Sequence, residues 1–493
     1  MSVLDDLDPR TPVIAGVGIA TQSVDEPGGG DDAAALMTAA AVRAGTDSGE
    51  SAVLAAVQQV AVPAGTWAYP DPGRLVAERI GAPQARTVLV QVGIPQQTLF
   101  DDAYHAIRSG TLDVALVVGG EAARRAAIAR RAGVDVQDTV QADVTPDELQ
   151  LPKTEIITRV EIEGGVASAM APFALIDSAL RYAEGKSIAE QRDEIARLYA
   201  GFSAVATTFP HAAFPEPRTE EFLREPSESN RPFSFPYNKW HCAQMNVDQA
   251  AAILVCSAEA ARRLGVDPAR VVYPVVALES SLFVPVSRRR AMHRWPAMEV
   301  LGAAAEAHLG FPLTDIDSVE IYSCFPAAIR VQQRALGLPV DGIPTITGGE
   351  AFAGGPWNNF VLQSTAAMID RIRDRGEPYG LVTALSGLMN KPGLAVYSTV
   401  PPEQPALVAD LVDDATRATE TLEVVTGYQG PAVVAACTAG YDGLDPVRCT
   451  VIADTPSGDR CVATAHDAEI ARASTTEELI GRTITVDATT FTM

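Results

Sequence analysis

The sequence has few cysteines, and their spacing does not indicate a metal site or a redox pair. Its 493 residues include six cysteines and six histidines, and none of the cysteines forms a C-x-x-C pair. In a chain of this length, such scattered cysteines are typical of reduced thiols in the core of a cytosolic protein. The histidines show no metal-ligand spacing either, so we expect no metal site.

Basic residues and long apolar runs are also scarce. Lys and Arg number 38 against 62 Asp and Glu, a formal net charge of −24. This balance disfavours a nucleic acid as partner, because phosphate binding needs a basic face. The apolar runs are shorter than the roughly 18 residues that a membrane span needs, and the acidic, polar residues 1–12 do not resemble a signal peptide. We therefore expect a cytoplasmic protein without a membrane span.

The most informative segment joins an apolar, β-branched run at residues 87–92 to a helical pattern that ends at Ser109-Gly110. A second buried run at residues 114–121 completes a β-α-β unit. Residues 93–96 then lie at a helix N-terminus, where free N–H groups and the helix dipole stabilise a thiolate or an oxyanion. This is a natural position for a nucleophile. The sequence there, Gly-Ile-Pro-Gln, carries no nucleophilic side chain.

Strands and helices alternate in a similar order in two parts of the chain, residues 12–121 and 298–387. Two related α/β halves are the simplest explanation, each with a mainly parallel sheet covered on both faces. We place the first half at residues 1–265, including an insertion at about 124–237 that is rich in charge and proline. The second half is placed at residues 266–405.

Residues 406–493 follow a proline-rich linker and have an all-β pattern. The segment Thr-Pro-Ser-Gly-Asp at residues 455–459 indicates a hairpin turn between two strands. Ser474 and Glu477 have the spacing of a capping box and predict the start of one short helix. Short strands with a single helix are typical of a small barrel of the oligomer-binding type, so we expect an additional C-terminal β-barrel-like domain.

Several motifs, taken together, resemble those of the thiolase superfamily. They lie at residues 106–110, 117–121, 247–252, 321–325 and 348–356. The Gly-Gly-Pro-Trp-Asn-Asn string and the extra C-terminal region further resemble the type-1 thiolase-like proteins of actinobacteria, often labelled acetyl-CoA acetyltransferase. The resemblance implies a layered αβαβα fold of two duplicated halves with an inserted loop domain. It also implies a role in acyl-CoA or lipid metabolism.

The resemblance breaks at the catalytic positions. Thiolases use a nucleophilic Cys, an Asn or His that helps form an oxyanion hole, the His of a G-H-P motif, and a second Cys. These positions fall on Gly93, Tyr322, Gly355 and the neighbourhood of Ser386-Gly387, none of which carries the required side chain. Without a thiolate and its base, covalent acyl transfer lacks its nucleophile. We expect no conventional thiolase activity and no tightly bound cofactor. The resemblance still implies that coenzyme A or an acyl-CoA would lie against Gly93, Ile94, Gly354, Gly355, Ser386 and Gly387.

Three side chains are candidates for chemistry in place of the missing thiolase catalytic residues. Tyr322 could donate a hydrogen bond to an alkoxide or act as a general acid–base, or be a buried structural tyrosine. Cys324 could be a displaced nucleophile, or a small core residue. Asn358, beside Asn359, could donate to a thioester oxygen, or the pair could cap a helix. His241 lies beside Cys242, but adjacent residues rarely point at one another.

Two arginine clusters, residues 124–131 and 288–294, stand out against the acidic total. Either could bind the phosphates of coenzyme A, or form a solvated or ion-paired face.

Three functions stay open: carbon–carbon bond chemistry on an acyl-CoA assisted by Tyr322, a non-catalytic acyl-CoA-binding or scaffold protein, and an acetyl-CoA acetyltransferase with a rearranged site at Cys324. The sequence predicts neither the acyl group nor the oligomeric state, monomer or dimer.

Overall fold

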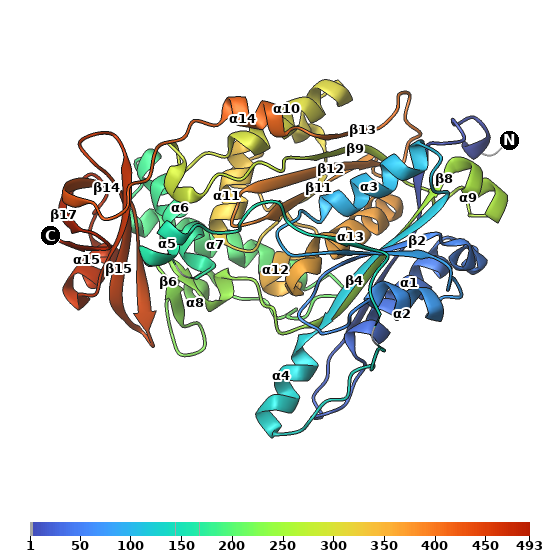
Figure 1. Cartoon of the computed structure of the whole chain (residues 1–493), viewed down its shortest axis with the longest axis horizontal. Helices are drawn as coiled ribbons and strands as arrows, with labels where there is room; N and C mark the ends of the chain where they lie inside the picture. The colour runs from blue at the N-terminus through green and yellow to red at the C-terminus, as the bar shows by residue number, and fades with distance from the viewer. Residues whose placement is uncertain (1–2, 143, 167) are drawn as a thin grey trace.

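The structure is a computed structural model, and it describes residues 3–142, 144–166 and 168–493. Residues 1 and 2 of the expected first half, and residues 143 and 167 of the expected insertion, lie outside the described residues. Three β-sheets organise the rest of the chain (Figure 1). Across the described ranges, no helix combines the length and apolar character that a membrane crossing needs.

The first sheet has six strands in the order β1-β8-β4-β2-β3-β5. Strand β8 is antiparallel to β1 and β4, whereas β2 pairs in parallel with β3 and β4. The three strands β1, β4 and β8 are buried along almost their whole length, as strands covered on both faces should be. The strands of this sheet are β1 (Pro12–Gln22), β2 (Gln59–Pro63), β3 (Arg86–Val90), β4 (Val114–Ala122), β5 (Glu148–Gln150) and β8 (Asp248–Ser257).

The second sheet repeats the arrangement of the first, with the order β10-β11-β12-β9-β13. Strand β12 is antiparallel to β9 and β11, and β10 is parallel to β11. The order β9-β12-β11-β10 therefore matches β1-β8-β4-β2, and the expected duplication of the halves is confirmed. The strands here are β9 (Tyr273–Glu279), β10 (Ser318–Glu320), β11 (Tyr379–Ser386), β12 (Lys391–Ser398) and β13 (Leu407–Asp410). Strand β13 follows residue 405 and still joins this sheet, in parallel with β9.

Helices separate the two sheets and cover their outer faces. Helices α3 (Gln97–Arg108) and α13 (Phe360–Arg375) contact strands of both sheets and form the central layer. On the outer side of the first sheet, α1 (Ala33–Asp47) packs against β1 and β8, and α2 (Pro72–Arg79) against β2. The outer helices of the second half, and the short helix after β8, are α10 (Pro296–Leu309), α11 (Pro326–Ala335) and α9 (Ala258–Leu264). This αβαβα layering confirms the expected fold.

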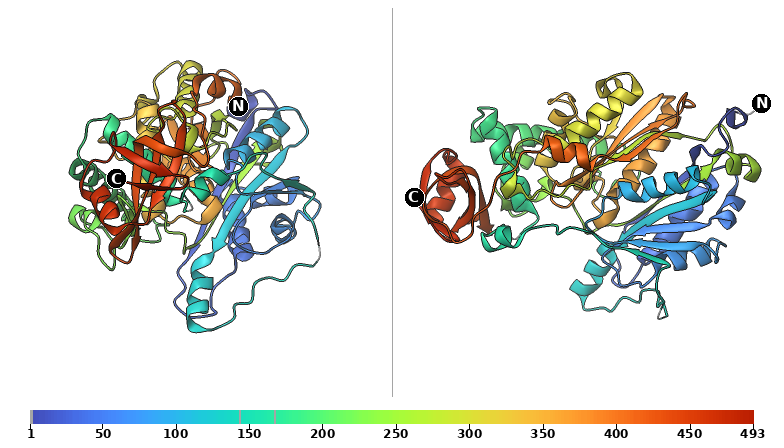
Figure 2. Two further views of the ribbon diagram at one scale, coloured as in Figure 1. Left: turned by 60° about the vertical axis from the view of Figure 1, so that its left-hand side comes forward. Right: turned by 45° about the horizontal axis from the view of Figure 1, so that its top comes forward.

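The segment between β4 and β8 contains mostly helices. Strand β5 returns to the edge of the first sheet beside β3, and the helices that follow it lie between the two sheets and the C-terminal sheet (Figure 2). The helices of this segment are α4 (Ala123–Ala132), α5 (Arg159–Glu163), α6 (Met170–Ala183), α7 (Ile188–Ala206) and α8 (Glu220–Arg224). Two short strands, β6 (Pro232–Ser234) and β7 (Tyr237–Asn238), close the segment.

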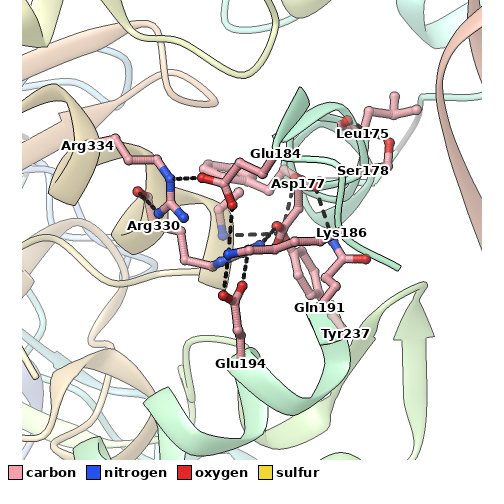
Figure 3. A network of polar contacts seen from close by, with 12 residues as sticks. Leu175, Asp177, Ser178, Glu184, Lys186, Gln191, Glu194, Tyr237, Arg330 and Arg334 are labelled. Carbon is pink, nitrogen blue, oxygen red and sulfur yellow. Dashed lines mark hydrogen bonds and ion pairs between the residues drawn. The ribbon is translucent and has the colours of Figure 1, made fainter. Parts of the chain in front are cut away.

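A buried ion-pair network joins these helices to the second half (Figure 3). Arg330 of α11 pairs with Asp177 of α6 and, at 2.6 Å, with Glu194 of α7. The Arg330 side chain is 4% exposed and that of Asp177 is 0% exposed. Tyr237 donates its phenol hydrogen to Asp177 Oδ2 at 2.8 Å. The network reaches the surface through three further charged side chains, Glu184, Lys186 and Arg334.

The C-terminal region forms a third, antiparallel sheet with the order β16-β15-β14-β17-β18. The N–H of Thr464 donates to the carbonyl oxygen of Thr489, which precedes β18, at 2.9 Å. The sheet therefore curls, and it has an apolar core of its own. Its strands are β14 (Gln429–Asp442), β15 (Asp445–Asp454), β16 (Arg460–Ala465), β17 (Thr483–Asp487) and β18 (Thr490–Thr492). Helix α15 (Ala468–Thr476) packs against β14 and β15, whereas α14 (Val412–Ala418) packs against α10 of the second half.

The expected start of the C-terminal helix is wrong. Helix α15 begins after Asp467, whose carboxylate accepts the N–H groups of Glu469 and Ile470. Ser474 lies in the last turn, where its hydroxyl donates to the carbonyl oxygen of Ala471 at 2.7 Å. A serine can bond to the preceding helical turn as well as cap an N-terminus, and the spacing to Glu477 does not distinguish the two roles.

Candidate functional site

The corner between β3 and α3 forms where the sequence predicts it, but there is little room for a side chain at Gly93. Gly93 has a φ of +102°, a conformation that favours glycine. Its carbonyl oxygen accepts a hydrogen bond from Lys391 Nζ at 2.7 Å. A Cβ atom at position 93 would lie 3.1 Å from Cβ of Pro152 and 3.4 Å from Cγ1 of Ile156. The position expected for a nucleophile is therefore crowded.

Replacing Gly93 with cysteine is expected to destabilise the protein by about 1–3 kcal/mol, because the backbone conformation disfavours a side chain and Pro152 would have to shift. Urea unfolding measures the loss. Gly81, at φ +85° with no atom within 4 Å of the place that a Cβ atom would occupy, provides the matched control. If Gly81→Cys costs as much as Gly93→Cys, crowding by Pro152 and Ile156 contributes nothing. We also expect no thiolase activity from Gly93→Cys.

Side chains of both halves meet at the N-terminus of α3. Gln96 accepts the N–H of Val361 at 3.0 Å and donates to Oδ1 of Asn358 at 3.3 Å. The Nδ2 group of Asn358 donates to the carbonyl oxygen of Ala64 at 3.3 Å. Asn358 thus lies at the corner, but its amide already binds protein groups on both sides.

Asn359 occupies the N-cap position of α13 without capping it. Its side chain makes no hydrogen bond to the helix and is 2% exposed. Neither amide atom has a partner among the described residues. A Cβ atom on Gly119 would lie 2.3 Å from its Oδ1, so the amide packs directly against β4.

Tyr322 lies just beyond the end of β10, which stops at Glu320. The N–H of Tyr322 donates to Thr383 Oγ1 at 2.9 Å, and its carbonyl oxygen accepts from Gln332 Nε2 at 2.9 Å. Its ring packs edge-on against Phe360. Burial, and then the nearby carboxyl of Glu350, raise the pKa of the Tyr322 phenol well above its usual value. The phenol therefore keeps its proton at neutral pH.

Glu350 is a buried acid that the sequence reasoning missed. Its side chain is 3% exposed, and Oε1 has no hydrogen-bond partner within the described part of the chain. Burial raises the pKa of Glu350 to about 8. A Cβ atom on Gly355 would lie 3.2 Å from Glu350 Oε2. The carboxyl thus lies beside the position that the resemblance assigns to the G-H-P histidine. Its place within a glycine-rich motif gave no sign of this burial.

Cys324 lies next to this acid and is a poor thiolate. The side chain is buried, and burial followed by the charge of Glu350 raises the pKa of the thiol well above its usual value.

His241 and Cys242, adjacent in the sequence, do not pair with each other. His241 Nδ1 accepts the N–H of Asn238 at 3.1 Å, and the Cys242 thiol points to the Asn238 carbonyl at 3.5 Å.

Ser386 and Gly387 lead into the turn between β11 and β12. Three successive residues of this turn, Gly387, Leu388 and Met389, have φ values of 65°, 55° and 63°. The Asn390 amide donates to the carbonyl oxygen of Gly387. Non-glycine residues rarely adopt this conformation, so the turn that the resemblance assigns to the second cysteine is instead a tightly fixed hairpin.

A cavity of about 540 Å³ opens beside the corner and is lined by Ile94, Pro95 and Thr98. Its wall includes Glu279, whose Oε2 accepts the Thr98 hydroxyl at 2.6 Å, and Lys391. Burial raises the pKa of Glu279 to about 7 and lowers the pKa of Lys391. The sequence analysis predicted neither residue. Glu279 ends the otherwise apolar strand β9, and Lys391 begins β12, outside the motifs.

The arginine clusters are largely ion-paired. In the first, Arg124 pairs with Asp25 at 2.9 Å and Arg125 with Asp138 at 2.6 Å. In the second, three arginines pair with carboxylates, Arg288 with Glu423, Arg290 with Glu420 and Arg294 with Glu299. Arg289 differs from these three, because it donates to backbone carbonyl oxygens.

Residues 412–490 match the family described as thiolase-like protein type 1 additional C-terminal domain. The match spans α14 and the curled third sheet. Among curated proteins, no significant match to the sequence was found.

Solved structures resemble the chain over most of its length. A monomeric SCP2-thiolase-like protein type 1 from Mycobacterium smegmatis is 28% identical, with a TM-score of 0.84 over 99% of this chain and 100% of that one. The Ltp2-ChsH2(DUF35) aldolase is 18% identical, with a TM-score of 0.59 over 80% and 99% of the two chains. Human mitochondrial 3-ketoacyl-CoA thiolase in complex with CoA is 17% identical, with a TM-score of 0.56 over 81% and 100%. The last two likenesses show the fold alone.

Proposed function

We propose that this chain, a protein of the thiolase superfamily similar to the type-1 thiolase-like proteins, acts on an acyl-CoA. It does so in the cytoplasm and without a cysteine nucleophile. The reaction we propose is the making or breaking of a carbon–carbon bond in lipid metabolism, assisted by Tyr322. A solved thiolase of the same fold binds CoA, which supports coenzyme A thioesters as the ligand class.

The observation that carries this proposal is that two protonated groups, Tyr322 and Glu350, are near enough to interact electrostatically. The resemblance assigns Tyr322 to the position of the thiolase Asn or His, and Glu350 lies beside Gly355, which it assigns to the G-H-P histidine. Protonated donors stabilise negative charge as it develops on a thioester oxygen. In the cleavage of a 3-hydroxyacyl-CoA, a base takes the 3-hydroxyl proton, the C2–C3 bond breaks, and C2 gains a proton. We assign hydrogen-bond donation to Tyr322. With a pKa of about 8, Glu350 in its carboxylate form is the base that takes the 3-hydroxyl proton, and it then returns this proton to C2.

Replacing Tyr322 with phenylalanine is expected to slow the cleavage of a 3-hydroxyacyl-CoA about a hundred-fold or more, because a positioned proton donor contributes at least that much. Product formation followed by mass spectrometry measures the rate. Tyr273 is 2% exposed in β9, and Tyr273→Phe is the control that should leave the rate unchanged. An equal rate in the wild type and Tyr322→Phe would exclude the catalytic tyrosine.

A non-catalytic acyl-CoA-binding or scaffold protein is the second candidate, favoured by the crowding of Gly93 and the burial of Tyr322. Calorimetric titration with a panel of acyl-CoAs separates the two candidates from a protein that binds none. Binding without turnover of any substrate supports the second candidate. The absence of binding to all of them contradicts an enzyme and an acyl-CoA-binding protein, and only a scaffold role then remains. An acetyl-CoA acetyltransferase that uses Cys324 is disfavoured, since its thiol keeps its proton at neutral pH.

A further inference from the structure

A second cavity, of about 180 Å³, lies between the start of α10 and the turn that follows β11. Leu282, Val284 and Trp295 supply apolar walls, and Ala418 at the end of α14 lies at its exposed rim. Arg289 lines the same cavity. None of the residues assigned to the proposed reaction lines this cavity, so the two sites can be tested separately.

The Arg289 guanidinium is held rigidly by neutral groups. Its Nε donates to the carbonyl oxygen of Val284 at 3.1 Å. Its Nη2 donates to the carbonyl oxygen of Met389 at 2.7 Å and to Asn390 Oδ1 at 3.2 Å. Asn390 Oδ1 in turn accepts the N–H of Val284 at 2.9 Å. Together these bonds fix the guanidinium against the cavity wall.

This guanidinium makes no direct ion pair within the described residues. In the described ranges, Nη1 of Arg289 has no hydrogen-bond partner, and the side chain is 5% exposed. Burial lowers the pKa of Arg289 to about 10, so the group is still charged at neutral pH. Glu161 is the carboxylate that acts on it electrostatically, but its oxygens accept hydrogen bonds from Ser287 and Thr158.

Uncompensated buried charges are costly. The arginines on either side, at positions 288 and 290, each face a carboxylate. A rigid, buried and unpaired guanidinium in the wall of a cavity is the arrangement that binds an oxyanion with charge-assisted hydrogen bonds. The apolar side chains that line the same cavity favour a ligand with a small hydrocarbon part.

We propose that this cavity binds the carboxylate or phosphate group of a compact organic anion, with Arg289 as counter-ion and the apolar part of the ligand against Leu282, Val284 and Trp295. A volume of about 180 Å³ is below the roughly 300–1,000 Å³ of sites for drug-sized ligands. The ligand is therefore small, and a whole coenzyme A does not fit.

Calorimetry on the full chain at constant ionic strength tests the site with three probes: inorganic phosphate, phenyl phosphate and benzoate. We expect saturable binding of at least one probe, and Arg289→Gln should weaken it about ten- to a hundred-fold, the loss of one charge-assisted hydrogen bond. Tighter binding of phenyl phosphate or benzoate than of inorganic phosphate identifies an organic ligand. The reverse order identifies free phosphate as the ligand.

Two further variants keep the test decisive if Arg289→Gln does not fold. Ala418→Trp fills the exposed rim without touching Arg289 and should abolish binding of the organic probes. Arg288→Gln removes an exposed arginine that pairs with Glu423 and should leave binding unchanged. Binding of no probe to the wild type, or equal binding to the wild type and Ala418→Trp, overturns the proposal. Acyl-CoA titrations of the same variants test the proposed function independently.

Discussion

Replacing Arg330 with methionine is expected to lower the free energy of unfolding by about 3–5 kcal/mol, because it leaves a buried carboxylate without its counter-ion. Asp177 is fully buried and pairs with Arg330, and Tyr237 alone cannot compensate its charge. The same arginine also binds Glu194 on a second helix, so α6 and α7 both lose their link to α11 (Figure 3).

Urea unfolding of Arg330→Met, with Arg288→Met as an exposed control, measures the effect. Surface ion pairs contribute about 0–1 kcal/mol, so the control should change little. The double variant Arg330→Met/Asp177→Leu should regain part of the loss, since it removes the unpaired charge as well. A loss in Arg330→Met no larger than in the control would mean that the buried network does not stabilise the packing of the helices.

Replacing Glu350 with glutamine is expected to stabilise the protein at pH 9 by about 3–5 kcal/mol and to have little effect at pH 5. The pKa of Glu350 is about 8 in the folded protein, raised from 4.5 by burial, so the folded state binds this proton more tightly than the unfolded state. Between these values the folded protein carries more protons, and its free energy of unfolding falls as pH rises. Glutamine has almost the same shape and never ionises, so it removes this loss.

Unfolding midpoints of the wild type and Glu350→Gln, measured from pH 5 to pH 9, test the expectation. Exposed Glu228 provides the control Glu228→Gln, whose profile should follow that of the wild type. Burial also raises the pKa values of Glu279 and Glu320 to about 7. In the wild type and in both variants, these two residues therefore still make the free energy of unfolding fall as pH rises. Parallel profiles for the wild type and Glu350→Gln would contradict a protonated Glu350.

The alternation of strands and helices predicted two related α/β halves, and the resemblance implied their αβαβα layering. The run that becomes β4 contains Gly119 and Gly120, and the run that becomes β11 is followed by Gly387. These are local signals that the sequence shows directly. Strand β10 ends at Glu320, because Tyr322 turns its N–H to the Thr383 hydroxyl and Pro326 begins α11. The contact with Thr383 is not local in the sequence.

The chemistry of the site was predictable only in part. The sequence singled out Gly93 and Tyr322, because the resemblance assigns each of them to a catalytic position. It could not identify Glu350 or Glu279, since a carboxyl becomes unusual only when tertiary packing removes its water. For the same reason, the sequence could not separate Arg289 from Arg288 and Arg290.

Strand β5 has a consequence for association between chains. A bare sheet edge offers unpaired N–H and C=O groups to a strand of another molecule. Here the outer edge of β3 is taken by three residues of its own chain, Glu148–Gln150, and the N–H of Gln91 extends the pairing by donating to the Gln150 carbonyl at 3.0 Å. The chain then runs directly into Pro152 and Ile156, which crowd Gly93. One short segment thus leaves only a three-residue strand at this sheet edge, which offers little to a strand of another molecule, and it also crowds the neighbouring corner.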